Sequence, residues 1–62
     1  MEWKKVYYPS GKLKKETPYS DGKKNGIEKI YYENGKLMSE TIYTNGTMGA
    51  TKNYDENGNG IK

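Results

Sequence analysis

The sequence predicts an all-β protein, a single-layer antiparallel meander of about five strands built from 24-residue β-hairpin repeats. Residues 3–23 align with residues 27–47 at a fixed offset of 24, and ten of the 21 aligned positions are identical. Short runs rich in Ile, Tyr and Thr flank Asn34-Gly35, which is a strong β-hairpin signal. No stretch has the apolar period of a helix that could cover a sheet.

The repeat divides the 62 residues into a single domain or array fragment of two full copies and one partial copy. The copies are repeat 1 (3–26), repeat 2 (27–49) and partial repeat 3 (50–62). In the partial copy, the sequence YDENG at 54–58 corresponds to YYENG at 31–35. The identical pairs are Lys5/Lys29, Tyr7/Tyr31, Tyr8/Tyr32, Gly11/Gly35, Lys12/Lys36, Leu13/Leu37, Glu16/Glu40, Thr17/Thr41, Tyr19/Tyr43 and Gly22/Gly46.

Each full repeat is predicted to form one hairpin. The predicted strands are residues 3–8, 13–19, 27–32 and 37–43. The turn at Asn34-Gly35 is predicted to be a two-residue type I′ turn, because Asn and Gly tolerate positive φ. Residues 20–26 and 44–49 are expected to be loops between successive hairpins. Pro18 has no N–H to donate, so we expect it at an edge, a bulge or a strand end.

The strand register follows from charge pairing. A two-residue loop places Lys29 opposite Glu40, Ile27 opposite Ile42 and Tyr32 opposite Leu37. The same register in repeat 1 places Lys5 opposite Glu16. A bulged three-residue loop would shift the pairing and oppose Glu28 to Glu40, and directly opposed like charges destabilise a sheet.

Alternation along the strands predicts two different faces. The first face is the more apolar, so we expect it to form the core, covered by curling of the sheet or by a second copy of the chain. It holds Val6, Tyr8, Leu13, Thr17, Tyr19, Ile30, Tyr32, Leu37, Thr41 and Tyr43. The second face holds Trp3, Lys5, Tyr7, Glu16, Pro18, Ile27, Lys29, Tyr31, Glu40 and Ile42.

Composition argues against several classes of function. Only 31% of residues are apolar, and there is no Cys, His or Arg. The sequence therefore predicts no disulfide, no zinc site and no cofactor. Residues 1–24 hold seven Lys and three acidic residues. Without Arg, the bidentate contacts favoured in nucleic-acid recognition are missing, so a nucleic-acid partner is not expected.

The sequence offers no catalytic constellation, so we expect that the protein is not an enzyme. Glu16 and Glu40 are assigned to pairs with Lys, and the serines have no neighbouring base. Residues 55–60 (DENGNG) fit the start of a calcium loop, but the Glu expected at the twelfth position is missing. We interpret this segment as the turn of repeat 3. No apolar run could span a membrane or serve as a signal peptide, which favours a cytoplasmic location.

The repeated pattern resembles the MORN repeat variant, which occurs in tandem arrays in many bacterial proteins. The residues that carry the resemblance follow the pattern Y-Y-x-x-G-K-L-x-x-E-T-x-Y-x-x-G-K-K-N-G. The resemblance implies an extended sheet of successive hairpins and a role in contact with protein or lipid. Some bacterial family members are labelled as antitoxin components.

These observations predict a non-catalytic repeat scaffold that mediates protein–protein interaction or self-association, with a homo-oligomer expected. Two alternatives remain. One is peripheral binding to anionic lipid through the Lys-rich first repeat, and the other is an antitoxin-like partner of a toxin. The candidate interaction surface is Trp3, Lys5, Tyr7, Lys14, Tyr31 and Met38. The candidate structural turn residues are Gly11, Asn34 and Gly35.

Overall fold

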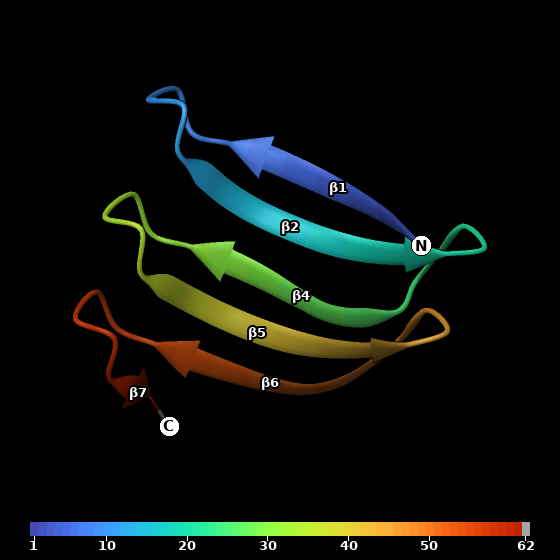
Figure 1. Ribbon diagram of the computed structural model, residues 1–62. Coiled ribbons are helices and arrows are strands. Elements are labelled where there is room, and N and C mark those ends of the chain that lie inside the picture. The colour runs from blue at the N-terminus through green and yellow to red at the C-terminus, as the bar shows by residue number, and fades with distance from the viewer. Residues whose placement is uncertain (62) are drawn as a thin grey trace.

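The computed structural model describes residues 1–61 as one antiparallel sheet, curved along its strands (Figure 1). The strand order is β1-β2-β4-β5-β6-β7, and β3 pairs with β2. The strands are β1 (Glu2–Tyr7), β2 (Leu13–Ser20), β3 (Lys23–Lys24), β4 (Gly26–Tyr31), β5 (Leu37–Thr44), β6 (Thr47–Tyr54) and β7 (Gly60–Ile61). The extents of 34 × 29 × 12 Å are those of a single layer. The predicted fold class is confirmed. Lys62, the last residue of the predicted third repeat, lies outside the described residues.

The predicted charge register is confirmed over most of each hairpin. Lys29 lies opposite Glu40, and Ile27 lies opposite Ile42. In the first hairpin Lys5 lies opposite Glu16. The register then shifts by one residue near the turn, where Tyr31 rather than Tyr32 lies opposite Leu37. The predicted pairing of Tyr32 with Leu37 is therefore wrong.

The predicted type I′ turn at Asn34-Gly35 is also wrong. The amide of Gly35 donates to the carbonyl of Tyr32 at 2.9 Å, and the amide of Tyr32 donates to the carbonyl of Lys36 at 2.8 Å. Gly35 has a φ of 89°, whereas Asn34 is not among the residues with positive φ. This is a three-residue loop that ends in a glycine bulge. The side chain of Asn34 accepts a hydrogen bond from the amide of Lys36 at 2.8 Å, which braces the loop.

A second bulge explains why the charge pairing survives this different turn. Between the pairs Tyr31–Leu37 and Ile30–Ser39, Met38 is an extra residue without an opposite partner. In the first hairpin the extra residue is Lys14. The bulge cancels the shift made by the three-residue loop. The charge argument therefore predicted the central register correctly. It could not distinguish a two-residue turn from a three-residue loop combined with a bulge, because both give the same pairing of Lys29 with Glu40.

Type I′ geometry occurs at the opposite end of the sheet. Asp21-Gly22 has φ values of 52° and 78°, and Asn45-Gly46 has φ values of 49° and 88°. These are two-residue turns between the pairs Ser20–Lys23 and Thr44–Thr47. The segments 20–26 and 44–49, predicted as loops, are therefore mostly strand. The error arose because the strands continue up to each turn, and only the two turn residues of each segment and Asn25 lie outside them.

Pro18 lies at an interruption of the ladder, as predicted. On the side away from β1, the strand β2 pairs with β4 at Lys15 and Glu16 and with β3 at Tyr19 and Ser20, so its partner changes across Thr17 and Pro18. The carbonyl of Pro18 accepts a hydrogen bond from the amide of Asn25 at 3.0 Å. Gly26 (φ 121°) provides the space for the proline ring, because a Cβ there would lie 3.0 Å from Cγ of Pro18.

The register and alternation define two faces, since directly opposed residues share a face. We name them the striped face and the threonine face. The striped face holds Trp3, Lys5, Tyr7, Leu13, Glu16, Pro18, Ile27, Lys29, Tyr31, Leu37, Glu40, Ile42, Ala50, Lys52 and Tyr54. The threonine face holds Glu2, Lys4, Val6, Tyr8, Lys14, Lys15, Thr17, Tyr19, Lys24, Glu28, Ile30, Tyr32, Met38, Ser39, Thr41, Tyr43, Met48, Thr51 and Asn53.

The predicted assignment of Leu13 and Leu37 to the Val6 face is wrong. Leu13 lies opposite Tyr7, and Leu37 lies opposite Tyr31, so both leucines belong to the striped face. The cause is the bulge, which adds one residue after each leucine and reverses the alternation there.

The expected apolar core is also absent from the described part of the chain. None of its Ala, Val, Ile, Leu, Met, Trp or Tyr residues is buried. The buried polar residues all lie on the threonine face, which was predicted to be the core: Thr17, Glu28, Ser39 and Thr41, with exposed fractions of 2%, 7%, 9% and 9%. Largely exposed apolar side chains lie on both faces, with Trp3, Tyr7, Ile27 and Ile42 on the striped face and Val6 and Met48 on the threonine face.

Candidate interaction surface

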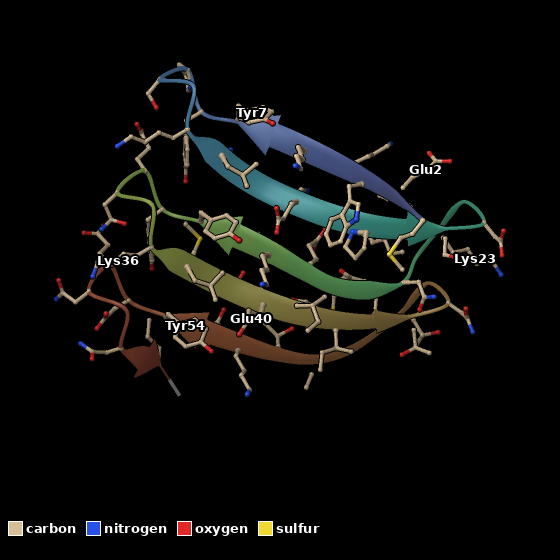
Figure 2. All side chains as sticks on the ribbon, in the orientation of Figure 1. Glu2, Tyr7, Lys23, Lys36, Glu40 and Tyr54 are labelled. Carbon is tan, nitrogen blue, oxygen red and sulfur yellow. The ribbon has the colours of Figure 1, made fainter. Side chains whose placement is uncertain are left out.

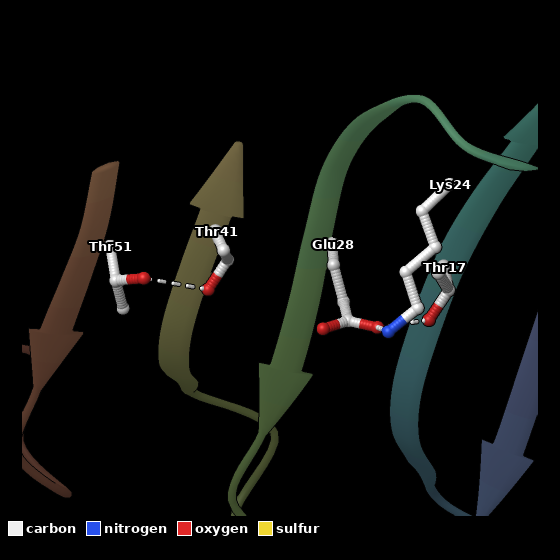
Figure 3. Close-up of polar contacts among 5 residues, drawn as sticks. All are labelled: Thr17, Lys24, Glu28, Thr41 and Thr51. Atoms are coloured by element: carbon white, nitrogen blue, oxygen red, sulfur yellow. Dashed lines mark hydrogen bonds and ion pairs between the residues drawn. The ribbon is translucent and has the colours of Figure 1, made fainter. Parts of the chain in front are cut away.

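Polar contacts hold the threonine face together. Thr17 donates a hydrogen bond to Oε2 of Glu28 at 2.6 Å, and Nζ of Lys24 lies 3.4 Å from the same oxygen (Figure 3). The hydroxyls of Thr41 and Thr51 are hydrogen-bonded at 3.1 Å. Burial alone would lower the pKa of Lys24, but the charge of Glu28 and its hydrogen bond outweigh this effect and raise the pKa. The carboxylate of Glu28 is thus buried with both an amine and a hydroxyl partner, as a buried charge requires.

Tyrosine rings on the same face hold lysine side chains. Nζ of Lys4 lies 5.3 Å from the ring centre of Tyr19, and Nζ of Lys24 lies 4.8 Å from that of Tyr43. Lys14 is 5.6 Å from the ring centre of Tyr8. These distances are in the range of cation–π contacts. Several lysines of the first repeat therefore contact the protein itself.

Tyrosine hydroxyls join each repeat to the next in two equivalent ways. Tyr8 donates to the carbonyl of Tyr31 at 2.6 Å, and Tyr32 donates to the carbonyl of Tyr54 at 2.7 Å. Two other tyrosine hydroxyls, those of Tyr31 and Tyr54, make contacts in the other direction, to the previous repeat. Because all of these contacts recur at both repeat boundaries, they stabilise the stacking of hairpins.

The contacts to the previous repeat link a tyrosine to a glutamate on the striped face. Tyr31 donates to Oε1 of Glu16 at 3.4 Å, and Tyr54 donates to Oε1 of Glu40 at 3.0 Å. Burial and Glu16 raise the pKa of Tyr31. The hydrogen bond to Glu40, together with partial burial, raises the pKa of Tyr54. Figure 2 shows Tyr54 and Glu40 side by side on the face turned towards the viewer.

The striped face carries three parallel rows of side chains that run across the strands. The middle row alternates in charge and consists of Lys5, Glu16, Lys29, Glu40 and Lys52. An apolar row lies on one side of it: Trp3, Pro18, Ile27, Ile42 and Ala50. An aromatic and aliphatic row lies on the other side: Tyr7, Leu13, Tyr31, Leu37 and Tyr54. The face is thus an alternating charge ladder between two apolar stripes.

In the row that begins with Trp3, four of the five side chains are exposed to solvent, all except Pro18, whereas in the row that begins with Tyr7, Tyr7 is exposed and the other four are half-buried. The exposed fractions are 51% for Trp3, 43% for Ile27, 46% for Ile42 and 56% for Tyr7. Shallow depressions lie along the rows, one lined by residues that include Trp3, Pro18 and Ile27, and another by Leu13 and Tyr31 among others. An apolar surface of this kind, crossed by charges, is typical of an interaction site.

The structure brings together four of the six predicted interaction residues. Trp3, Lys5, Tyr7 and Tyr31 share the striped face. Lys14 and Met38 lie on the threonine face because each is the extra residue of a bulge. The prediction missed Ile27 and Ile42, although alternation alone already placed them beside Lys29 and Tyr31. It also missed Leu13 and Leu37, which reach this face only because of the bulges.

The predicted turn residues and the segment 55–60 form equivalent loops. Gly11 and Gly58 have φ values of 92° and 91°, close to the 89° of Gly35. The carboxylate of Asp55 accepts hydrogen bonds from the amides of Asn57 and Asn59, each at 2.9 Å. These backbone hydrogen bonds, chiefly the one from Asn59, lower the pKa of Asp55. Its carboxylate braces the turn of repeat 3, as interpreted from the sequence. Within residues 1–61 no three His, Cys, Asp or Glu side chains cluster as metal ligands.

The repeat geometry agrees with a comparison against known families. The pattern of the MORN repeat variant family matches residues 4–21 and 24–45, and the chain belongs to this family. The two matched segments cover the second hairpin and all of the first except Glu2 and Trp3. Searches of curated proteins and of solved structures gave no match. Members of the family are generally repeat scaffolds without catalytic activity, and they often function in binding to protein or membrane lipid.

Proposed function

We propose that this chain is a non-catalytic scaffold that binds protein through its striped face, and that a second copy of the chain is one such partner. The observation that carries the proposal is the exposure of Trp3, Tyr7, Ile27 and Ile42 on one face of a sheet one layer thick. Burying these side chains would contribute about 25 cal/mol per Å² of apolar surface removed from water.

The charge ladder makes the striped face complementary to itself. Consider a second copy stacked face to face and related by a two-fold axis parallel to the strands. An axis midway between β2 and β4 places Lys5 opposite the partner's Glu40, and Glu16 opposite the partner's Lys29. Each apolar row then packs on its own counterpart. An axis on a strand would oppose like charges, so the ladder favours axes that lie midway between two strands.

The test is the solution mass by light scattering over a wide range of concentration. We expect the wild-type chain to form dimers as concentration rises. The variant Ile27→Ser/Ile42→Ser should remain monomeric at the same concentrations. Val6→Ser is the matched control, because Val6 is 44% exposed but lies on the threonine face. A folded wild-type monomer at every concentration, or equal loss of dimers in the control, would contradict self-association through the striped face.

A second candidate is attachment to anionic lipid, which the basic residues of the first repeat favour. Lys4, Lys14, Lys15 and Lys24 share the threonine face. Three of them contact tyrosine rings, and Lys24 also pairs with Glu28. Vesicle binding that rises with anionic lipid and falls with salt would support this candidate. An antitoxin-like role would be a form of the first proposal, with a toxin as the protein partner.

A further inference from the structure

The outer edge of β1 is a second surface, which adjoins the striped face at Lys5 and Tyr7. β1 is the first strand of the sheet and pairs with β2 on one side only. Within residues 1–61 no strand pairs with its other side. Two neighbouring exposed lysines, Lys4 and Lys5, lie on this edge strand. Lysine at a sheet edge opposes pairing with an identical edge, but it leaves the edge open to a strand of opposite charge.

The internal repeat boundaries show how a strand equivalent to β1 is docked. β4 is the copy of β1, and the return strand β2 of the preceding hairpin pairs with it antiparallel. In that pair Glu16 lies opposite Lys29 and accepts the hydrogen bond from Tyr31. At the next boundary Glu40 lies opposite Lys52 and accepts the hydrogen bond from Tyr54. A single glutamate of the added strand thus meets a lysine and a tyrosine each time.

β1 presents the same lysine and tyrosine on its open side. By the repeat offset of 24, Lys5 corresponds to Lys29 and Tyr7 corresponds to Tyr31. Tyr7 is 56% exposed, and within the described residues its hydroxyl makes no hydrogen bond. Lys5 has Glu16 on its inner side only. The charge ladder therefore ends at β1 with the positive charge of Lys5. By the internal pattern, a strand that pairs with the open edge of β1 would carry a glutamate opposite this lysine.

β1 differs from β4 at one position, and this difference indicates which kind of segment can pair with the open edge of β1. Next to Lys29, β4 carries Glu28, which accepts a hydrogen bond from Thr17 of the docked strand. At the equivalent position β1 carries Lys4. A threonine opposite Lys4 would leave the ammonium group without a counter-charge, whereas a carboxylate would pair with it. The return strands of this chain carry Glu-Thr at these two positions, so they fit the β1 edge less well than a strand with two consecutive acids.

We propose that the outer edge of β1 binds an extended acidic segment of a partner protein by antiparallel strand addition. One glutamate of the segment contacts Lys5 and Tyr7 on the striped face, and the next residue, also acidic, contacts Lys4 on the threonine face. Main-chain hydrogen bonds to β1 supply the remaining contacts, as in other cases of recognition by strand addition. This inference does not depend on the proposed function, because strand addition uses the free backbone edge of β1, although Lys5 and Tyr7 belong to both surfaces.

The probe is a synthetic peptide that copies residues 36–44 with Glu in place of Thr41. Binding is followed by the fluorescence of Trp3, the single Trp of the chain, which lies on β1. We expect saturable binding. A peptide with Gln in place of both acids should bind at least about tenfold more weakly, because both charge-assisted contacts are lost. The unmodified copy with Glu-Thr should be intermediate. If the unmodified copy binds as tightly as the two-acid peptide, the segment is another copy of this chain and the proposal is wrong.

Three protein variants locate the site. Lys4→Glu/Lys5→Glu should abolish detectable binding. The matched control Lys23→Glu/Lys36→Glu makes the same change in net charge at exposed positions away from β1, and it should alter affinity by less than about twofold. Tyr7→Phe removes only one exposed hydroxyl, so folding is preserved, and binding should weaken by about three- to tenfold. Equal losses in both charge-reversal variants would show attraction to net charge only and would overturn the proposal.

Peptides methylated on backbone nitrogens separate strand addition from electrostatic attraction. Only every second amide of an added strand faces β1. Methylation of one alternate set should therefore abolish binding, and methylation of the other set should have little effect. Amide NMR shifts should change along β1 (Glu2–Tyr7). Insensitivity to both methylation patterns, or shifts confined to β6 (Thr47–Tyr54) and β7 (Gly60–Ile61), would refute docking at the β1 edge.

Discussion

The two faces of the sheet reverse the usual relation between polarity and burial. On the threonine face, Thr17 and Glu28 are buried and bonded to each other. On the striped face, Ile27 and Ile42 lie directly opposite each other but remain nearly half exposed. A sheet of one layer cannot enclose apolar side chains on both sides. The difference indicates that polar contacts and backbone ladders stabilise the threonine face, whereas the apolar side chains of the striped face are available to a partner.

The largest expected effect comes from removing the buried carboxylate of the threonine face. Glu28→Ala removes the acceptor of Thr17 and the partner of Lys24. The free energy of unfolding should fall by about 2 kcal/mol, measured by urea denaturation, since a buried donor loses its acceptor. Glu28→Gln should lose less, because its amide oxygen still accepts from Thr17. The exposed Glu33→Ala is the control and should change stability by less than about 0.5 kcal/mol. Equal effects at the two positions would contradict a structural role for Glu28.

A smaller loss of stability is expected from a substitution in the three-residue loop of the second hairpin. Gly35 has a φ of 89° and no heavy atom within 4 Å of an added Cβ, so Gly35→Val introduces backbone strain without a clash. We expect a loss of about 1–2 kcal/mol in unfolding free energy. Gly60→Val is the matched control, because Gly60 has open space and no positive φ. If both variants melt at the same temperature as the wild type, the glycine bulge is not needed for folding.

The smallest expected effect concerns the contacts between tyrosine and glutamate on the striped face. The pKa values of Tyr31 and Tyr54 are raised in the folded chain, so the folded state keeps these protons at a pH where the unfolded state has begun to lose them. Their contribution to stability is present below the ordinary tyrosine pKa near 10 and is lost as pH rises through the folded pKa. In Glu16→Gln/Glu40→Gln the alkaline loss of stability should be shallower, measured by urea denaturation between about pH 9 and 12. An unchanged pH profile would show that these contacts do not bias the titration.

The repeat carried enough information to predict the class of fold and most of the register. Both hairpins oppose Lys to Glu, at Lys5–Glu16 and Lys29–Glu40, and this pairing fixed the central register. The turn type was not readable, because Asn-Gly suits both a type I′ turn and the last two positions of a bulged loop. Local dipeptides do not reveal a second, compensating bulge at Met38. That bulge also moved Leu37 to the other face, so part of the candidate surface was beyond prediction.

Burial was the least predictable property. Counting apolar residues on each face assumed that the more apolar face would be covered. In a single layer, burial depends instead on how closely neighbouring strands and tyrosine rings cover a side chain. Thr17 and Glu28 are covered by Lys24 and by one another, whereas Trp3 lies on the edge strand. The burial of a side chain in this sheet is therefore determined by the arrangement of the repeats and not by the polarity of the residue itself.

The most direct test of this difference between the faces is the unfolding free energy of two opposite substitutions at a concentration where the chain is monomeric. Thr17→Val makes the threonine face more apolar, and Ile27→Thr makes the striped face more polar. Both residues are β-branched before and after the change, so strand propensity is preserved. We predict that Thr17→Val lowers stability by about 1–2 kcal/mol, because Glu28 loses a buried hydrogen-bond donor, and that Ile27→Thr costs less than half as much. The reverse order would contradict the account and would show that the striped face is the true core.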